Sequence, residues 1–417
     1  MADVQPLEAL HYDQAKAGPL QQLVAPPYDV IDPQQRAELA ARSPYNVVRV
    51  DLPEGDDPYA EAARLFRQWQ DDDAVIPDEP AFWALVQNYT GPDGRTLTRR
   101  GIFARVRVTE YGPGKIRPHE RTHPGPREDR LKLTRATKAN LSPIFSLYDD
   151  PEQRAWAALE PHTSAEPFGA ATDDDGTVNR LWRVADPDAL AQVAAELEPA
   201  ELLIADGHHR YETARVYADE IGGEGPHRYV LMCLVALQDE GLTVFPTHRL
   251  LTNVKESDMQ VALGARLREL FDIEQIEQSE LRPPDGTGPL TMGYIDAHHR
   301  QAYRLTLKDQ ATADQALADF PEPYRHLDTA ILEALIIKGP AGLTDDDIDH
   351  KHGLDYSRTD QEALEMVLDG RADCAFFLRS SPVQQVRDIA ATGVNMPPKS
   401  TFFFPKVPTG LLFNPVG

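Results

Sequence analysis

Cysteine and lysine are scarce in this sequence, and long apolar runs are missing. The two cysteines, Cys233 and Cys374, lie in the apolar runs VLMCLVAL and DCAFFL, where buried thiols are expected. Two such thiols cannot form a disulfide framework or a cysteine-based zinc site, so both are excluded. The mean hydropathy is -0.46, and no segment approaches the roughly 20 apolar residues of a membrane-spanning helix.

The chain is also strongly acidic. Its 42 Lys and Arg residues, of which ten are Lys, stand against 67 Asp and Glu residues, and the formal net charge is -25. Binding to a nucleic-acid backbone depends on clustered positive charge, so we expect no nucleic-acid partner. The N-terminal MADVQPLEALHYDQ is acidic and polar, unlike a secretory or transit signal, and we expect a cytoplasmic protein without a membrane partner. The sequence does not determine the oligomeric state.

Hydrophobic patterning predicts an α+β fold with mixed sheets, antiparallel hairpins and strand–turn–helix units. Two hairpins are expected: one joins AFWALVQNY and GIFARVRVTEY through GPDG, and the other joins PLTMGYIDA and QAYRLTL, with HHR as a turn. Strands are expected in NVVRVDL, ELLIA, YVLMCLVAL and CAFFL. Helices are expected at residues 59–69, at 208–221 before a glycine pair, and in LDTAILEALII, SRTDQEALEMVLDG and PVQQVRDIAATG.

Composition suggests a division of the chain into three parts. Residues 1–150 are expected to form an N-terminal α/β lobe with the APPYDV and HE motifs, and residues 199–417 a C-terminal α+β lobe with DGHHR and PPKST. Residues 151–198, rich in Ala, Asp and Pro, are a connector or a peripheral insertion. The Pro-rich C-terminal tail is too apolar for disorder and should pack against the body.

The strongest local signal is Asp206-Gly207-His208-His209-Arg210, between an expected strand and an expected helix. A helix N-terminus presents free N–H groups and the positive end of the helix dipole, which favour a phosphate or a carboxylate. Arg210 adds a bidentate fork for phosphate oxygens, and His208 or His209 could orient an anion or carry a proton. Asp206 could hold Mg²⁺ or deprotonate a hydroxyl. The alternative is a structural turn with a capping aspartate and surface histidines.

A second motif, PHERTH, occupies residues 118–123. Its last five letters match H-E-x-x-H, in which two histidines one helical turn apart bind zinc. Prolines on both sides disfavour a helix through the motif, so a zinc protease is not expected. A loop in which His119 and Glu120 form an acid–base pair is the better functional interpretation, and solvated loop charge is the alternative.

Four further segments carry candidate site residues. Lys399-Ser400-Thr401 resembles the end of a phosphate-binding P-loop, without the Gly-rich cradle or the following helix. A local positive pocket on a negative body would concentrate small anionic ligands. The other candidates are His248 and Arg249 in PTHR, Asp29 in APPYDV and Arg130 in EDR.

These motifs follow one another in a fixed order along the chain. From the N-terminus they are APPYDV from Ala25, NVV from Asn46, HE with Thr122, DRL from Asp129, SPIF from Ser142, ADGHHRY from Ala205, PTHR from Pro246 and PPKST from Pro397. In this order they resemble the bacterial and archaeal domain-of-unknown-function family 1015 over nearly the whole chain, except residues 150–198. The family is largely uncharacterised, so the resemblance implies no activity by itself. Its members tend to be encoded beside the phosphoserine pathway of serine synthesis.

DGHHR is also similar to the Gly-x-His-Arg-type nucleotide-contacting motif of the ParB/sulfiredoxin-like superfamily, which includes free-serine kinases. This resemblance implies a ParB/sulfiredoxin-like element around the motif and phosphoryl transfer on serine or phosphoserine. Sulfiredoxin chemistry is disfavoured, because neither cysteine lies in a polar, reactive setting.

The resulting hypothesis is a phosphotransferase or phosphohydrolase acting on a small phosphorylated metabolite, with serine or phosphoserine as the first guess. ATP or ADP with Mg²⁺ would be the cofactor, and neither zinc nor haem is expected. Phosphate or nucleotide would be held by Gly207, His209, Arg210, Lys399, Ser400 and Thr401. Glu120 or Asp206 would act as base or bind Mg²⁺, and His119 or His208 would protonate the leaving oxygen.

Two alternatives stay open at this stage. A non-catalytic nucleotide- or anion-sensing module would use the same phosphate cradle without turnover. A metal-dependent hydrolase would use His119, His123 and His208 as ligands and would contain stoichiometric zinc.

Overall fold

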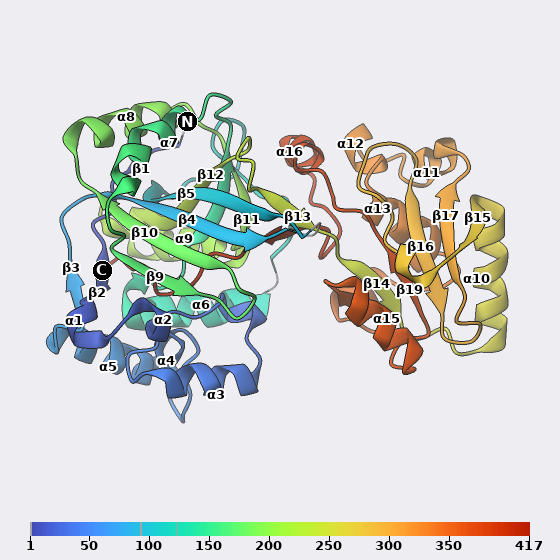
Figure 1. The fold of residues 1–417 in the computed structure, drawn as a ribbon, viewed down its shortest axis with the longest axis horizontal. Helices are drawn as coiled ribbons and strands as arrows, with labels where there is room; N and C mark the ends of the chain where they lie inside the picture. Colours follow the sequence, from blue (N-terminus) through green and yellow to red (C-terminus); the bar gives the residue numbers. More distant parts are fainter. Residues whose placement is uncertain (1, 92–93, 123) are drawn as a thin grey trace. The chain divides into compact units, whose positions relative to one another are not determined.

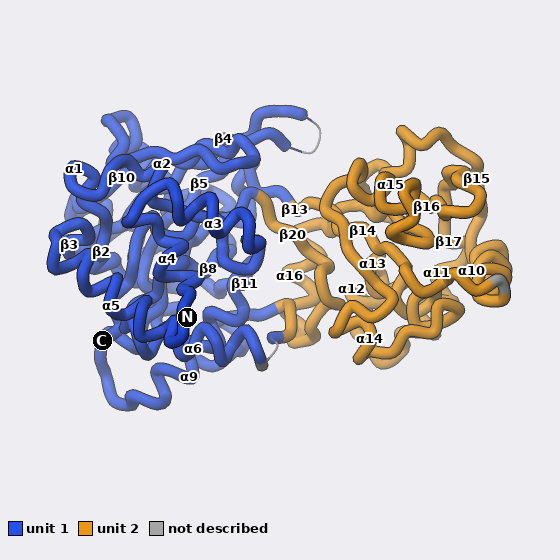
Figure 2. The backbone as a smooth tube through the Cα atoms, turned by 90° about the horizontal axis from the view of Figure 1, so that it is seen from below, with its two compact units in different colours: residues 1–118, 122–243, 405–417 blue, residues 119–121, 244–404 orange. Residues whose placement is uncertain are grey.

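The computed structural model describes residues 2–91, 94–122 and 124–417, and the chain forms two compact units (Figure 2). Unit 1 comprises residues 1–118, 122–243 and 405–417, and unit 2 comprises residues 119–121 and 244–404. The divisions expected near residues 150 and 198 both fall inside unit 1. Residues 151–198 belong to unit 1 because they add two strands to the sheet that contains the first hairpin.

Unit 1 is built on a large mixed sheet with the strand order β6-β11-β8-β12-β5-β4-β10-β9, and β1 pairs with β5 (Figure 1). Most neighbours are antiparallel, whereas β12 is parallel to β8 and β11 is parallel to β6. The strands are β1 (Val4–Gln5), β4 (Phe82–Thr90), β5 (Thr96–Arg107), β6 (Ile116–Arg117), β8 (Ile144–Tyr148), β9 (Gly169–Thr172), β10 (Val178–Val184), β11 (Leu202–Asp206) and β12 (Tyr229–Ala236).

The two faces of this sheet carry different side chains, because residues alternate along each strand. On one face, Ile102 and Ala104 of β5 join an apolar core with α7 (Arg154–Leu159) and α8 (Pro187–Leu197). The N-terminal helices lie on the other side of the sheet (Figure 1). They are α1 (Gln14–Ala17), α2 (Leu20–Leu23), η1 (Tyr28–Val30), α3 (Pro33–Arg42), α4 (Val48–Asp51) and α5 (Pro58–Asp71).

The C-terminal tail packs into unit 1, as its apolar content predicts. Phe413 is fully buried, and its ring lies 5.4 Å from Tyr12 and 5.3 Å from Phe66 between ring centroids. Two short sheets fasten the ends of the chain: β2 (Leu10–Tyr12) pairs with β3 (Val75–Pro77), and β7 (Ala139–Asn140) pairs with β21 (Asn414–Pro415).

The expected elements of unit 1 are confirmed in the described residues, apart from NVVRVDL. The first hairpin forms as β4 and β5, although residues 92 and 93 of its turn lie outside the described residues. The helix expected at 208–221 is α9 (His208–Ile221), which ends at Gly222. NVVRVDL, predicted as a strand, is the helix α4, in which the Asn46 side chain accepts the Val48 N–H at 3.0 Å. The helix α6 (Pro124–Thr137) is not predicted by the sequence pattern, because prolines generally disfavour a helix, whereas these two lie in its first turn, where proline is tolerated.

Unit 2 contains a second sheet with the order β15-β17-β16-β19-β14-β18. The expected hairpin is confirmed as β16 and β17, and CAFFL as β19. α15 (Asp360–Leu368) packs its Ala363 and Val367 against one face of the sheet. The strands are β14 (His248–Leu251), β15 (Phe271–Ile276), β16 (Thr291–Asp296), β17 (Ala302–Leu307), β18 (Leu354–Ser357) and β19 (Cys374–Phe377).

Further helices complete unit 2. The expected helix in LDTAILEALII is confirmed as α13 (Asp328–Leu332) with the π-helical turn η5 (Glu333–Ile337), and PVQQVRDIAATG as α16 (Val383–Ala391). The others are α10 (Ser257–Leu270), α11 (Gln310–Ala316), α12 (Glu322–Arg325) and α14 (Asp345–Asp349). The mixed α+β fold predicted from the sequence is therefore confirmed. In the part of the chain that the structure describes, no helix is long and apolar enough to cross a membrane.

Candidate functional site

The predicted site residues fall into two groups, one in each unit. Unit 1 contains Asp29, Arg130 and the whole DGHHR motif, residues 206–210. Unit 2 contains the members of the HE, PTHR and PPKST motifs, which are His119, Glu120, His248, Arg249, Lys399, Ser400 and Thr401. Each group is described below within its own unit.

DGHHR forms the predicted strand–turn–helix junction. Asp206 ends β11, Gly207 has φ of +97°, and α9 begins at His208. A Cβ at Gly207 would lie 3.0 Å from Arg210 Nε, because the guanidinium group folds back over the turn. Glycine is therefore required both by the backbone conformation and by the close approach of Arg210.

Asp206 is the centre of a partly buried ion cluster. Its carboxylate accepts hydrogen bonds from Arg210 Nη2 at 2.6 Å and from Lys406 Nζ in the C-terminal tail. Burial alone would raise the pKa of Asp206, but Lys406 and Arg210 hold it well below its usual range. Asp206 therefore carries a negative charge at neutral pH, and it is a weak proton acceptor because a good general base has a pKa near the working pH.

Arg210 also extends into a small pocket with a cavity volume of about 40 Å³. Its Nη1 donates to Ser142 Oγ at 2.7 Å and to the Pro143 carbonyl oxygen. Its Nε is buried without a hydrogen-bond partner among the described residues. The charged residues that line the pocket are Arg130, Arg210 and Asp51, and the polar ones are Tyr28, Thr134, Asn140, Ser142 and Thr213.

Arg130 enters the same pocket from α6, which packs against α9. Its Nη1 lies 3.0 Å from Asp51 Oδ1, and its Nε donates to Asp129 Oδ2 at 2.8 Å. The guanidinium carbon lies 4.2 Å from the centre of the Tyr28 ring. Burial raises the pKa of Tyr28 to about 12, although Arg210 and Arg130 oppose the rise, so its hydroxyl stays protonated and can donate a hydrogen bond.

Asp51 was not predicted as a site residue. It is the last residue of α4, is 3% exposed and lines the pocket beside Arg130. Burial raises the pKa of Asp51, with Arg130 and Arg210 opposing the rise. The pKa of Asp51 is therefore closer to the working range of a general base than the pKa of Asp206 is.

The PPKST loop of unit 2 uses its hydroxyl groups inside the protein. Ser400 Oγ is buried, 2.8 Å from Thr329 Oγ1 and 2.7 Å from the Pro397 carbonyl oxygen. Thr401 Oγ1 lies 2.8 Å from Nε2 of the buried His119. Lys399 is exposed and has φ of +56°. The loop thus lacks the helix and the open hydroxyl groups of a P-loop, and Lys399 is the member that faces solvent.

His248 and Arg249 have identifiable structural partners in unit 2. His248 Nδ1 accepts the Leu378 N–H at 3.2 Å, so Nε2 carries the proton that it donates to Asp360 Oδ1 at 2.7 Å. The buried Arg249 donates to the Pro398 carbonyl oxygen at 3.0 Å and to that of Lys399 at 3.2 Å. Arg249 therefore fixes the backbone of the PPKST loop through these two carbonyl groups.

The described residues hold no group of three or more His, Cys, Asp and Glu side chains arranged for a metal ion. His119 lies in unit 2 and His208 in unit 1, and His123 lies outside the described residues. Residues 119–122 are not helical, as the flanking prolines predict. The geometry of a zinc protease motif is thus not formed by the described part of the HE motif.

Residues 4–330 match the sequence model of a family described as a protein of unknown function (DUF1015). The chain belongs to this family. The match covers the pocket residues Tyr28, Asp51, Arg130 and Arg210 of the DUF1015 chain, and it ends before PPKST and Lys406. No curated protein matches the chain.

Several solved structures are similar to the DUF1015 chain. A conserved hypothetical protein from Pyrococcus furiosus has 14% identity and a TM-score of 0.36, covering 74% of this chain and 93% of its own. A mutant free serine kinase in complex with AMP has 10% identity and a TM-score of 0.37, covering 73% and 87%. SbnI from Staphylococcus aureus, with a C-terminal truncation, has 11% identity and a TM-score of 0.37, covering 75% and 87%. Likeness at this level bears on neither the substrate nor the site residues.

Proposed function

We propose that the protein is a phosphotransferase or phosphohydrolase for a small phosphorylated metabolite. Serine or phosphoserine is the first substrate to test, with ATP or ADP and Mg²⁺ as cofactor. The observation that carries the proposal is the pocket of unit 1, where Arg130 and Arg210 line one small cavity from two packed helices. Phosphoryl transfer depends mainly on positioning and on stabilisation of negative charge, which two convergent guanidinium groups supply.

Each residue of the pocket would have a different role. Arg210 Nε and the N-terminal turn of α9 would receive phosphate oxygens, because both present donors at the same place. Asp51 would accept the proton of the attacking hydroxyl or water. Asp206 would anchor Arg210 and Lys406 rather than act as the base, because its pKa is too low.

The size of the pocket limits what enters it. A cavity of about 40 Å³ has room for a few water molecules, whereas pockets that enclose a drug-sized ligand measure roughly 300–1,000 Å³. The phosphoryl end of a ligand would therefore enter, and the rest of the molecule would lie outside. The roles suggested for Glu120, His119, His208 and Lys399 remain predictions, to be tested by Glu120→Gln and Lys399→Ala.

A thermal-shift experiment tests the phosphate site. Inorganic phosphate, phosphoserine, serine, ATP and ADP, each with and without Mg²⁺, are added to the wild type, Arg210→Gln and Arg215→Gln. Arg215 is the matched control, because it lies on the same helix, pairs with Glu212 and is absent from the pocket lining. We expect phosphorylated ligands to raise the Tm of the wild type and of Arg215→Gln, but not that of Arg210→Gln. An equal shift in Arg210→Gln, or no shift in the wild type, contradicts the proposal.

Turnover separates an enzyme from a sensor. Transfer or release of phosphate, followed by ³¹P NMR, is measured for the wild type and for Asp51→Asn, which retains the shape of the side chain. Loss of a general base slows a reaction by roughly 10²–10⁴-fold, so we expect that loss with ligand binding retained. Binding without turnover in the wild type would instead show an anion-sensing module.

A further inference from the structure

Unit 2 contains a cavity of about 310 Å³ between α10 and one face of its sheet. On the opposite face, α15 closes a continuous apolar core. The cavity opens to solvent beside the exposed residues Arg268, His298 and His299, so it is a pocket and not an enclosed void. It falls within the range of roughly 300–1,000 Å³ that is typical of pockets for small organic ligands.

The sheet gives the cavity an aromatic floor. Tyr294 of β16 and Tyr303 of β17 are direct partners in the antiparallel pair, so their side chains lie next to each other on one face. The Phe376 ring lies 5.2 Å from that of Tyr294 between centroids. Leu263 and Leu267 of α10 and Leu305 of β17 form apolar walls. This lining suits a flat apolar ring.

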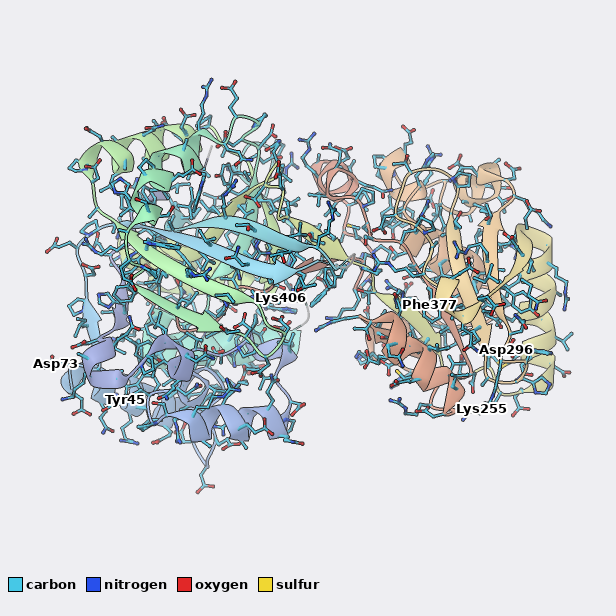
Figure 3. All side chains as sticks on the ribbon, in the orientation of Figure 1. Tyr45, Asp73, Lys255, Asp296, Phe377 and Lys406 are labelled. Atoms are coloured by element: carbon cyan, nitrogen blue, oxygen red, sulfur yellow. The ribbon has the colours of Figure 1, made fainter. Side chains whose placement is uncertain are left out.

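Two carboxylates mark one end of the cavity, where β16 pairs with β19. Asp296 (labelled in Figure 3) ends β16, and Asp373 directly precedes β19. Asp296 Oδ1 accepts the backbone N–H groups of His298 and His299 at 3.0 and 2.6 Å, within the turn formed by HHR. Asp373 Oδ2 accepts the Val254 N–H at 2.9 Å.

The charge at this end of the cavity is negative. Burial raises the pKa of the Cys374 thiol on the floor, and the charges of Asp296 and Asp373 raise it further. The basic residue Arg268 lines the cavity from the exposed side of α10. Its guanidinium group folds back along α10, with Nη2 3.4 Å from the Cβ position of Gly264. The acidic end therefore favours a cation, and it disfavours an anion.

Gly264 adds an observation from the helix side. It lies in the interior of α10 and lines the cavity, although glycine there costs roughly 1 kcal/mol relative to alanine. A Cβ at this position would meet nothing closer than Arg268 Nη2 at 3.4 Å, which is ordinary contact. Packing within the protein therefore does not require glycine, whereas a ligand in the cavity would use the space that a side chain would fill.

We propose that this cavity binds a small aromatic amine, with its ring on Tyr294 and Tyr303 and its ammonium group at Asp296 and Asp373. The ring stacks on the aromatic floor between the leucine walls, and the cation is stabilised by two carboxylates. Asp373 is otherwise held by a backbone N–H group, and Asp296 by two backbone N–H groups and by the His299 ring, whose Nδ1 lies 3.1 Å from Oδ1 and 3.2 Å from Oδ2. This site is separate from the phosphate pocket of unit 1, and neither proposal depends on the other.

Binding of tyramine by the full-length protein, measured by isothermal titration calorimetry, tests the proposal. The matched ligand is 3-(4-hydroxyphenyl)propionate, which has the same ring with a carboxylate in place of the amine. We expect tyramine to bind and the propionate to bind at least tenfold more weakly. Absence of tyramine binding, or equal binding of the two compounds, overturns the proposal.

Variants then locate the site. Asp296→Asn can still accept both backbone N–H groups through its amide oxygen, so we expect the fold to be retained and tyramine affinity to fall at least tenfold. Gly264→Val fills the cavity and should abolish binding, whereas Ala265→Val, on the exposed side of the same helix, should leave it unchanged. Tyramine affinity that is unaffected by Asp296→Asn or by Gly264→Val overturns the assignment, and circular dichroism verifies that each variant is folded.

Discussion

Asp206 joins two cations that lie far apart in the sequence. It pairs with Arg210 four residues later in sequence and with Lys406, which is 200 residues away. The carboxylate fixes the positions of both cations through these ion pairs. Removing one partner of such a buried cluster leaves the others uncompensated, which is why these residues act as a unit.

Asp173, in the DDDG turn of unit 1, carries a charge that opposes folding at neutral pH. Burial raises its pKa to about 7, the hydrogen bond from Asn179 opposes the rise, and Asp175 and Asp174 add to it. Its pKa in the unfolded chain is near 3.8. The folded state therefore binds more protons between about pH 4 and pH 7, and the free energy of unfolding falls as the pH rises through that window.

Asp173→Asn should remove this loss. We expect the difference in the free energy of unfolding between the variant and the wild type to grow by on the order of 1–2 kcal/mol, in favour of the variant, as the pH rises from 4 to 8. Urea denaturation at the two pH values measures the difference. Asp175→Asn, at an exposed position in the same turn, removes one of the charges that add to the rise of the Asp173 pKa and leaves its burial in place, so we expect a smaller gain. An equal gain in that control would assign the effect to net charge.

At the scale of elements, the conformation of the turn between β11 and α9 determines where the Arg210 guanidinium group lies, because that group packs against Gly207. Gly207→Ala places a Cβ at positive φ and 3.0 Å from Arg210 Nε. We expect a loss of about 1–2 kcal/mol in the free energy of unfolding. We also expect the phosphate-dependent thermal shift to disappear, because Arg210 must move.

Gly222→Ala is the matched control for that turn. Gly222 has φ of +71° at the other end of α9, and its Cβ would meet nothing within 4 Å. It should cost at least as much backbone strain, because its ψ of 172° lies in a region that is essentially restricted to glycine, and it should leave ligand binding intact. Equal binding by both variants would show that the position of Arg210 does not matter for the ligand.

A buried polar chain crosses the strands of unit 1 toward the tail. Arg99, 1% exposed, donates from Nε to Gln87 Oε1 at 3.0 Å, and burial lowers its pKa to about 10. Gln87 Nε2 donates to Asn179 Oδ1 at 2.7 Å and to the Lys406 carbonyl oxygen at 3.0 Å. Asn179 then donates to Asp173 Oδ2 at 2.9 Å. This series of hydrogen bonds fixes the backbone of Lys406 (Figure 3), whose side chain binds Asp206.

Sequence patterns predicted elements with strong periodicity, apolar runs or clear end signals, including the short strands β11 and β19, and missed the long helices α6 and α10. The β4–β5 hairpin and α9 have strong periodicity or clear end signals. α4 was misassigned because a short apolar run suits a strand or a helix equally well, and Asp51 at its end was missed with it. Nothing local in FFFPKVP marks Lys406, because its partner lies 200 residues away.

The sequence indicated candidate residues, and the structure shows which of these candidates lie together. Arg130 and Arg210 were both candidates, and they line one pocket. The hydroxyl groups of Ser400 and Thr401, expected to bind phosphate, have partners inside unit 2. Residue type and motif thus indicate candidates, whereas tertiary packing decides which donors are already used.

At the scale of the whole molecule, unit 2 is an insertion into unit 1. The chain leaves unit 1 in β13 (Thr243–Phe245) and returns after β20 (Phe402–Phe404). These two strands pair, and the rings of Phe245 and Phe404 are stacked with centroids 4.5 Å apart. Because the two ends of the insertion lie together, unit 1 can close around the last segment of the chain.

The tail, residues 405–417, is therefore expected to be essential to unit 1. It supplies Lys406 to Asp206, pairs Thr409 with Ala25 through two backbone hydrogen bonds of 2.8 and 3.1 Å, and buries Phe413 completely. Deleting it exposes the apolar surface that Phe413 covers and leaves Asp206 with one cation fewer. Each of these losses is worth roughly 1–3 kcal/mol or more, a large share of the stability of a domain.

Hydrogen exchange of the chain truncated after residue 404 measures the consequence. We expect the amide protection of β4 and β5 to fall strongly, whereas α15 retains its protection because unit 2 has its own core. A chain that lacks only the exposed Gly417 is the control and should match the full chain. Unchanged protection in β4 and β5 would show that the tail is an accessory, and a loss in α15 as well would show that the two units fold as one.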